Sequence, residues 1–351
     1  MVESNNKIQL IFSFVSYILS GCFIFSPLHK SQNILLSLIS AFITGSILLY
    51  LILCIYGKKS ISRPTGIFYI FLTSTASLIS TFFSLMLITE VIKDTAYVAA
   101  RDVSFIYYIL LSLATAFVGA YLCLGKSKGI LRFTVLYFFS FIFTLSISFC
   151  AFITTRHIHT IPLTNIFTPS ISSIKTGVTA GVFFTADSSI YLYCMQHYFA
   201  GKGGKFQKKQ IYAAYITAFI VISAYNLLTA CIFGSNLMQT IKDPDYALVK
   251  LIPGIDFTEL ISFIRIVSYL IKSAVYIHTA SMCLSVVFKN PSRAKKALVY
   301  SSYALIPLTV ILLSVFDSTL EYGAFQHLMT PVAIIMSALF TAIKIIYQKD
   351  T

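Results

Sequence analysis

The sequence predicts an all-α polytopic membrane protein with about ten transmembrane helices. Apolar stretches of about twenty residues recur along the chain, and a helix of about that length crosses the roughly 30 Å hydrocarbon core of a bilayer. Because that core offers no water to backbone amides, repeated stretches of this kind indicate a bundle of spanning helices. The composition agrees, since 57% of the residues are hydrophobic and 11% are charged, with a mean hydropathy of +0.84.

The apolar stretches extend over the whole chain of 351 residues and are joined by short loops, which indicates one membrane domain. The predicted spans are, in order, 8–27, 33–56, 66–92, 103–124, 133–155, 174–199, 211–234, 259–287, 297–316 and 325–347. Each half of the chain, 8–155 and 171–347, contains five spans. Because five is an odd number, the first and sixth spans cross the membrane in opposite directions, and the two halves can form a five-plus-five inverted repeat. We therefore expect residues 1–351 to form a single transmembrane domain.

Basic residues separate the loops into two sets. The loops on one side carry fourteen of them: Lys58, Lys59, Arg63, Lys126, Lys128, Arg132, Lys202, Lys205, Lys208, Lys209, Lys289, Arg293, Lys295 and Lys296. The loops on the other side carry six: Lys30, Lys93, Arg101, Arg156, Lys242 and Lys250. The positive-inside rule places the first set and both termini in the cytoplasm. The basic residues lie between apolar stretches and not on a folded surface, so the formal charge of +14 does not indicate nucleic-acid binding.

Small residues in the first and sixth spans admit two interpretations. Span one contains Ser20-Gly21-Cys22 past its middle and Pro27 at its end, and span six contains Gly177 and Gly181 followed by the polar stretch 185–189. Transporters built from inverted repeats interrupt the first helix of each half near the bilayer midplane, and the interruptions form the binding site. Small residues also let membrane helices pack closely. The residues alone leave both interpretations open.

Two charged residues fall near the middle of predicted spans, where an ionisable side chain costs a few kcal/mol. Asp187 lies near the centre of span six, and Lys272 lies near the centre of span eight. An unpaired charge at this depth would lose its ionisation, so we expect the two side chains to lie near each other or to share a polar cavity. They form either a structural pair between helices or part of a ligand or proton path.

Span eight carries polar side chains at three- and four-residue intervals, which place them on one helical face. They are Ser262, Arg265, Ser268, Tyr269, Lys272, Tyr276 and Thr279. Arg265 is two turns nearer the outer surface than Lys272 and is expected to anchor the helix at the interface. In the outer segment before this span, Asp243-Pro244-Asp245 offers a cap and a first-turn proline, which predict a short helix at the outer mouth of the site.

Short motifs spread over nearly the whole chain carry a family resemblance. They are Gly21–Pro27 (GCFIFSP), Ile161–Asn165 (IPLTN) with the span that follows it, Gly234, Lys242–Val249 (KDPDYALV), and Glu259 followed by Lys272–Tyr276 (KSAVY). In these motifs and in its ten-span layout the chain resembles the permease-like B subunit of bacterial spore germinant receptors. This endospore germination permease family belongs to the amino acid–polyamine–organocation transporter superfamily.

The resemblance implies a five-plus-five inverted-repeat fold with interrupted first and sixth helices, in the cytoplasmic or spore inner membrane of a bacterium. It implies a receptor subunit that binds a small nutrient germinant such as an amino acid and signals germination together with A and C subunits. The ligand would bind in a midplane cavity between spans one, three, six and eight. The candidate ligand-binding residues are Gly21, Cys22, Gly181, Thr185, Asp187, Tyr269, Lys272 and Tyr276.

Two other functions stay open at this level. One is a proton-coupled amino-acid secondary transporter that uses Asp187 or Lys272, and the other is a structural subunit with a degenerate pocket. A receptor and a transporter can share one scaffold, so the fold does not rank them. No Ser-His-Asp arrangement, Walker loop or pair of catalytic carboxylates can be assembled from the sequence. We therefore expect no enzymatic activity, no cofactor and no metal site.

Overall fold

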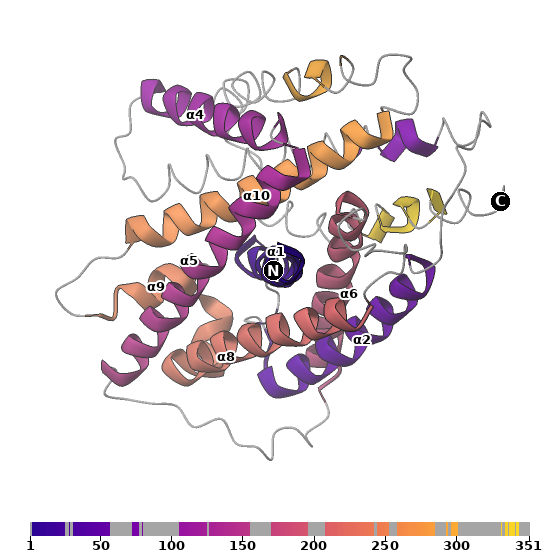
Figure 1. Cartoon of the computed structure of the whole chain (residues 1–351). Helices are drawn as coiled ribbons and strands as arrows, with labels where there is room; N and C mark the ends of the chain where they lie inside the picture. Colours follow the sequence, from indigo (N-terminus) through magenta and orange to yellow (C-terminus); the bar gives the residue numbers. More distant parts are fainter. Residues whose placement is uncertain are drawn as a thin grey trace.

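A computed structural model of the chain consists of helices and loops, with no strand among the residues that it describes (Figure 1). Its helices are α1 (Val2–Ile24), α2 (Ile34–Tyr56), α4 (Phe105–Leu124), α5 (Lys126–Thr154), α6 (Ile171–Cys194), α8 (Lys208–Thr240), α9 (Pro244–Val249) and α10 (Thr258–Leu284). The described residues are 2–24, 28, 31–56, 72–76, 79, 105–124, 126–154, 170–195, 208–241, 244–252, 258–284, 293, 296–300, 331, 334–335, 337–340 and 342–343.

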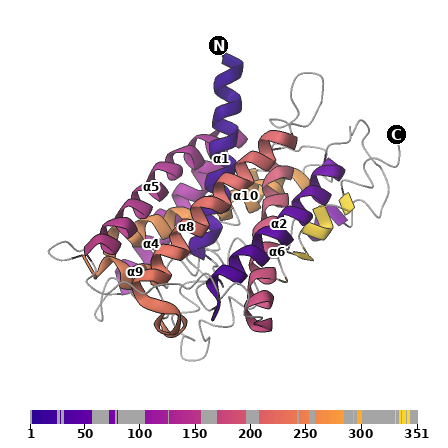
Figure 2. The ribbon, with the colours of Figure 1, turned by 90° about the horizontal axis from the view of Figure 1, so that it is seen from below.

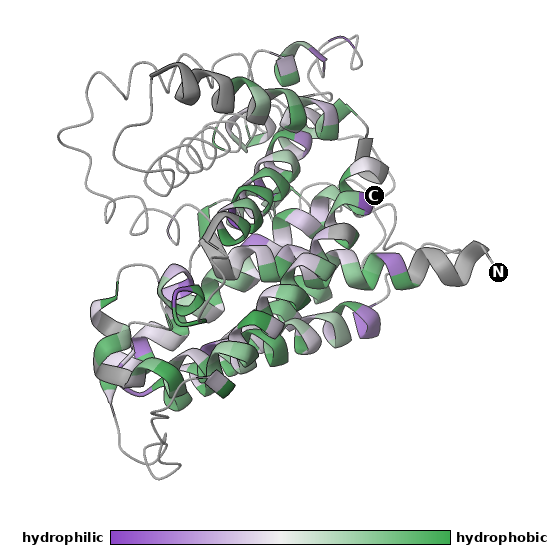
Figure 3. Ribbon diagram, turned by 90° about the vertical axis from the view of Figure 1, so that its left-hand side faces the viewer, coloured by the Kyte–Doolittle hydropathy of each residue, from purple (hydrophilic) through white to green (hydrophobic). Residues whose placement is uncertain are grey.

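Within the part of the chain that the structure describes, four helical segments are long and apolar enough to cross a membrane. They are Ile34–Ile55, Gly129–Thr154, Lys208–Gly234 and Leu260–Cys283, which match predicted spans two, five, seven and eight. Hydrophobic residues predominate along the helices in Figure 3. The all-α membrane class is confirmed. Predicted spans 66–92, 297–316 and 325–347 lie largely outside the described residues, so the count of ten spans, the inverted repeat and the domain division stay predictions.

Helix α1 lies at the centre of the bundle, in contact with α5, α6, α8 and α10 (Figures 1 and 2). Every residue from 13 to 21 is buried, as expected of a helix that is covered on all sides. Two of its serines hydrogen-bond within the helix: Ser16 donates to the carbonyl of Phe12 at 2.8 Å, and Ser20 donates to that of Tyr17 at 2.7 Å. These hydroxyls are therefore satisfied without a partner helix.

Helices α2 and α6 lie side by side at close range (Figure 2). A Cβ on Gly177 would overlap the backbone of Ser37, and a Cβ on Gly181 would overlap that of Ala41. These glycines thus serve close helix packing, and the predicted interruption of the sixth helix is wrong in the described residues, where α6 is continuous. Helix α1 also stays helical through Ile24, beyond the small residues Ser20-Gly21-Cys22, where the family resemblance implied a break.

Helix α8 bends at Gly234, whose φ of 73° and ψ of 159° belong to a region that glycine adopts without a Cβ clash. The bend directs the chain into the short helix α9, which confirms the helix predicted between spans seven and eight. Most residues of α9 are buried, namely Pro244, Asp245, Tyr246, Leu248 and Val249. This helix packs against α5, α8 and α10.

Candidate functional site

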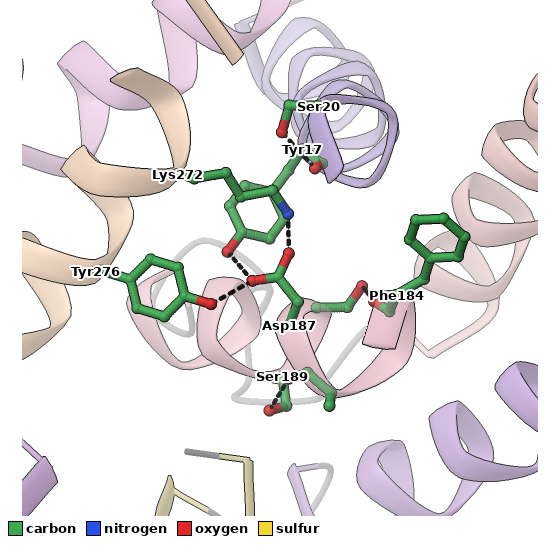
Figure 4. A network of polar contacts seen from close by, with 9 residues as sticks. Tyr17, Ser20, Phe184, Asp187, Ser189, Lys272 and Tyr276 are labelled. Atoms are coloured by element: carbon green, nitrogen blue, oxygen red, sulfur yellow. Dashed lines mark hydrogen bonds and ion pairs between the residues drawn. The ribbon is translucent and has the colours of Figure 1, made fainter. Parts of the chain in front are cut away.

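A buried ion pair joins α6 to α10 near the central helix α1 (Figure 4). The ammonium of Lys272 donates to Oδ2 of Asp187, and each of the two side chains is 3% exposed. Charges at this depth destabilise a protein unless they are paired. The structure brings together the two deep charges that the sequence predicted to lie near each other.

Two tyrosine hydroxyls also donate to the carboxylate of Asp187. Tyr17 of α1 and Tyr276 of α10 both donate to Oδ1 of Asp187, at 2.9 Å and 2.7 Å. Figure 4 shows the two phenols and the Lys272 ammonium converging on the carboxylate. An ionised carboxylate only accepts hydrogen bonds, and hydrogen bonds to an ionised group are stronger than neutral ones. The carboxylate of Asp187 therefore accepts hydrogen bonds from both α1 and α10.

The ammonium of Lys272 also contacts the central helix. Its Nζ lies 3.7 Å from the centre of the Tyr17 ring, within the range of a cation–π interaction. A Cβ added to Gly21 would lie 3.3 Å from the same nitrogen, so the absence of a side chain there makes room for it. Tyr17 and Gly21 are four residues apart and share one face of α1. This face of α1 therefore supplies both the aromatic ring that contacts the Lys272 ammonium and the space that the ammonium occupies.

A cluster of three hydroxyls lies one helical turn from the ion pair. Ser13 of α1 contacts both Thr134 of α5 and Tyr191 of α6, and all three residues are fully buried. The ring of Tyr191 lies 4.6 Å from that of Tyr17, between centroids. Ser13 precedes Tyr17 by four residues, and Tyr191 follows Asp187 by four, so the cluster lies on the side that the predicted topology assigns to the cytoplasm. It ties α1, α5 and α6 together on that side.

A second buried ion pair lies on α10, two turns before Lys272. Arg265 donates to Oδ2 of Asp245 in α9 at 3.2 Å, and these side chains are 8% and 11% exposed. The guanidinium lies 4.7 Å from the centre of the Tyr246 ring, and Tyr225 of α8 donates to the other oxygen of Asp245. The prediction that Arg265 anchors the helix at the interface is therefore wrong. The short helix α9 folds into the bundle and supplies a buried carboxylate.

Half of the eight candidate ligand-binding residues meet at the central ion pair. These four are Gly21, Asp187, Lys272 and Tyr276. Gly181 and Thr185 instead face α2, where Thr185 donates to the carbonyl of Gly45 at 3.1 Å. Tyr269 is buried on α10, one turn before Lys272. The side chain of Cys22 lies outside the part that the structure describes. The role of all eight in ligand binding stays a prediction.

Tyr17 is the residue at the pair that the sequence analysis missed. It donates to Asp187 and also covers the ammonium of Lys272 with its ring. Its residue type alone does not single out Tyr17, because the chain contains 22 tyrosines. Its position does give a signal, because Tyr17 lies one helical turn from Gly21 and in the middle of a predicted span.

Comparisons with known proteins show the fold. No family model matches the sequence, and no curated protein is similar to it. Among solved structures, the chain is similar to a Na+-coupled sialic acid symporter in its substrate-bound outward-open state. The two are 14% identical with a TM-score of 0.54, and the similarity covers 93% of this chain and 78% of the symporter. The chain is a multi-pass membrane protein whose fold is similar to that of this secondary transporter.

Proposed function

We propose that this protein binds a small charged molecule where α1, α6 and α10 meet. The observation that carries the proposal is the ion pair of Asp187 and Lys272, buried at the centre of a fold shared with a small-molecule symporter. Buried ion pairs are weak evidence for stability, because well-packed apolar side chains of similar volume often stabilise a protein as much or more. Ionisable residues in the interior of membrane proteins commonly mark ligand or ion pathways.

We further propose that the chain is the permease-like subunit of a spore nutrient germinant receptor, in a bacterial inner membrane with both termini in the cytoplasm. The motifs Gly21–Pro27, Lys242–Val249 and Lys272–Tyr276 support this proposal by their resemblance to that family. The germinant would be a small nutrient such as an amino acid, and A and C subunits would be the partners. A receptor needs only a difference in ligand affinity between two conformations, which shifts their populations.

A proton-coupled amino-acid transporter is the second candidate. The similarity to a Na+-coupled symporter favours it, because the fold of that protein carries out transport. In this case Asp187 or Lys272 would exchange a proton as the site alternates between the two sides of the membrane. A transporter must cycle its site across the membrane, whereas a receptor need not, and this difference separates the two candidates.

Spores and liposomes test the proposal together. Spores that lack this protein should lose their response to one nutrient, and Lys272→Met should raise the nutrient concentration required more than it lowers the maximal response. Lys175→Met is the matched control, because Lys175 is an exposed lysine on α6. The purified protein in liposomes should bind the nutrient saturably with little net uptake. Proton-driven accumulation without partners would establish the transporter instead, and unchanged spore responses would refute the receptor.

A further inference from the structure

The ammonium of Lys272 lies among groups that come mainly from other helices. Asp187 of α6 supplies the carboxylate, and Tyr17 of α1 supplies a ring face 3.7 Å from the nitrogen. Gly21 of α1 leaves the space beside it, since a Cβ there would approach the nitrogen to 3.3 Å. In Figure 4 the lysine side chain extends from α10 toward α1 and α6. The carboxylate, the ring face and the space around the ammonium therefore belong to helices other than the one that carries the lysine.

These groups match the chemistry of a primary ammonium ion. A carboxylate forms short charge-assisted hydrogen bonds with ammonium groups, and an aromatic face attracts a cation through its quadrupole. Tyr17 and Tyr276 both donate to the carboxylate, so they hold it in one orientation. The Tyr17 side chain therefore has two roles, one toward the carboxylate through its hydroxyl and one toward the cation through its ring face.

We propose that Tyr17, Gly21 and Asp187 form a recognition site for a primary ammonium group, and that Lys272 occupies this site from within the chain. The inference rests on the proposed function and names the part of the ligand that binds here. A ligand with a primary amine, such as an amino acid, binds by taking the place of the Lys272 ammonium on Asp187. The displaced lysine is then available to the carboxylate of the ligand. Ligand binding and release of the α6–α10 ion pair are thus one event.

Truncations of Lys272 test the proposal, because each removes a defined fragment of the side chain. Lys272→Ala removes three carbons and the nitrogen, which together equal propylamine. Lys272→Gly removes one carbon more, which equals butylamine. Lys272→Met retains an unbranched side chain of four heavy atoms, with sulfur in place of one methylene, and lacks the terminal nitrogen, so its matching probe is ammonium. Each variant should be stabilised most by its own fragment, and the order of preference should change from one variant to the next.

Thermal unfolding of the purified full-length protein in detergent provides the measurement. A fluorogenic thiol dye reports unfolding, because Cys123, Cys194 and Cys283 are buried. The matching amine should act at a concentration about tenfold or more below that of the alcohol of the same length, given the strength of hydrogen bonds between charged groups. Adding Asp187→Asn should abolish this preference. Lys175→Ala, which shortens an exposed lysine, should show no preference among the amines.

Several results would overturn the proposal. Amines that stabilise every variant equally, or that still act after Asp187→Asn, would show that no ammonium site exists. Na+ acting as well as the matching amine would assign the site to an inorganic cation. Lys272→Met conserves the volume of the side chain, so its response to ammonium decides the question even where the shorter truncations do not assemble. The readout needs neither spores nor transport, so failure of the germinant receptor proposal leaves this result intact.

Discussion

The ion pair of Asp187 and Lys272 predicts a strong coupling between two substitutions. Lys272→Met leaves the carboxylate without its ammonium, and Asp187→Asn leaves the ammonium without its carboxylate. Both side chains are 3% exposed, so water does not replace the lost partner. The double variant places two neutral side chains of nearly native volume in the same positions. Each single change should therefore be severe, and the double change should be milder than the two together.

The magnitude follows from the burial. Removing one partner of a buried pair costs about 3–5 kcal/mol, because the other charge stays uncompensated. At about 2 °C per kcal/mol for a chain of this size, each single variant should unfold roughly 6–10 °C below the native protein. In Asp187→Asn the new side-chain amide still offers an acceptor oxygen to the hydroxyls of Tyr17 and Tyr276, which limits the loss. The coupling should reach about 2–3 kcal/mol, or roughly 4–6 °C.

The assay is thermal unfolding in detergent, with all four members of the cycle purified and measured side by side. Lys175→Met serves as the control and should change stability by less than about 0.5 kcal/mol, since the residue is exposed. Single effects that add up in the double variant to within about 0.5 kcal/mol would refute the reasoning, because independent sites behave in this way. Such additivity would mean that the two charges do not interact in the folded protein.

Two further predictions concern packing and topology. Gly181→Ala should reduce assembly of the protein in membranes, because the added Cβ overlaps the backbone of Ala41. Gly21→Ala should assemble and shift the ligand response, because its Cβ would lie near side chains and not backbone, 3.3 Å from Nζ of Lys272 and 3.6 Å from the ring of Phe184. Equal amounts of both variants in membranes would contradict this. In a cysteine-free background, a cysteine at Lys205 should be shielded from an impermeant thiol reagent in intact cells, while one at Gln239 should react, and the reverse pattern would invert the topology.

The helices could be predicted because the length of an apolar stretch is a local property. The second span was expected at 33–56, and α2 covers Ile34–Tyr56. The central pair could also be predicted, because a charge at membrane depth needs a partner and Asp187 and Lys272 are both near the centres of their spans. Tyr17 could not be singled out by residue type, since burying a tyrosine hydroxyl costs much less than burying a charge and therefore gives a weaker signal.

The remaining errors have a common physical cause. Glycines in a membrane helix serve a break or a close contact, and only the position of the neighbouring backbone decides between them. For Gly181 that neighbour is Ala41, which lies far away in the sequence. Arg265 was assigned to the interface because it lies two turns nearer the outer surface than Lys272. Its partner, Asp245, gave no signal, since it lies in a segment between spans where a carboxylate is ordinary. Tertiary contacts of this kind leave no periodic trace in the sequence.

The two ion pairs also bear on how the chain is made. Helix α10 contributes the cation of each pair, and the carboxylates, Asp187 and Asp245, both precede α10 in the sequence. A cation at the centre of a helix that enters the bilayer alone costs about 2.5–3.5 kcal/mol on insertion scales. When the ribosome has completed α10, both of its counter-charges have already been synthesised. The order of synthesis therefore matches the order in which these charges can be buried, and α10 can leave the translocon against partners that are already present.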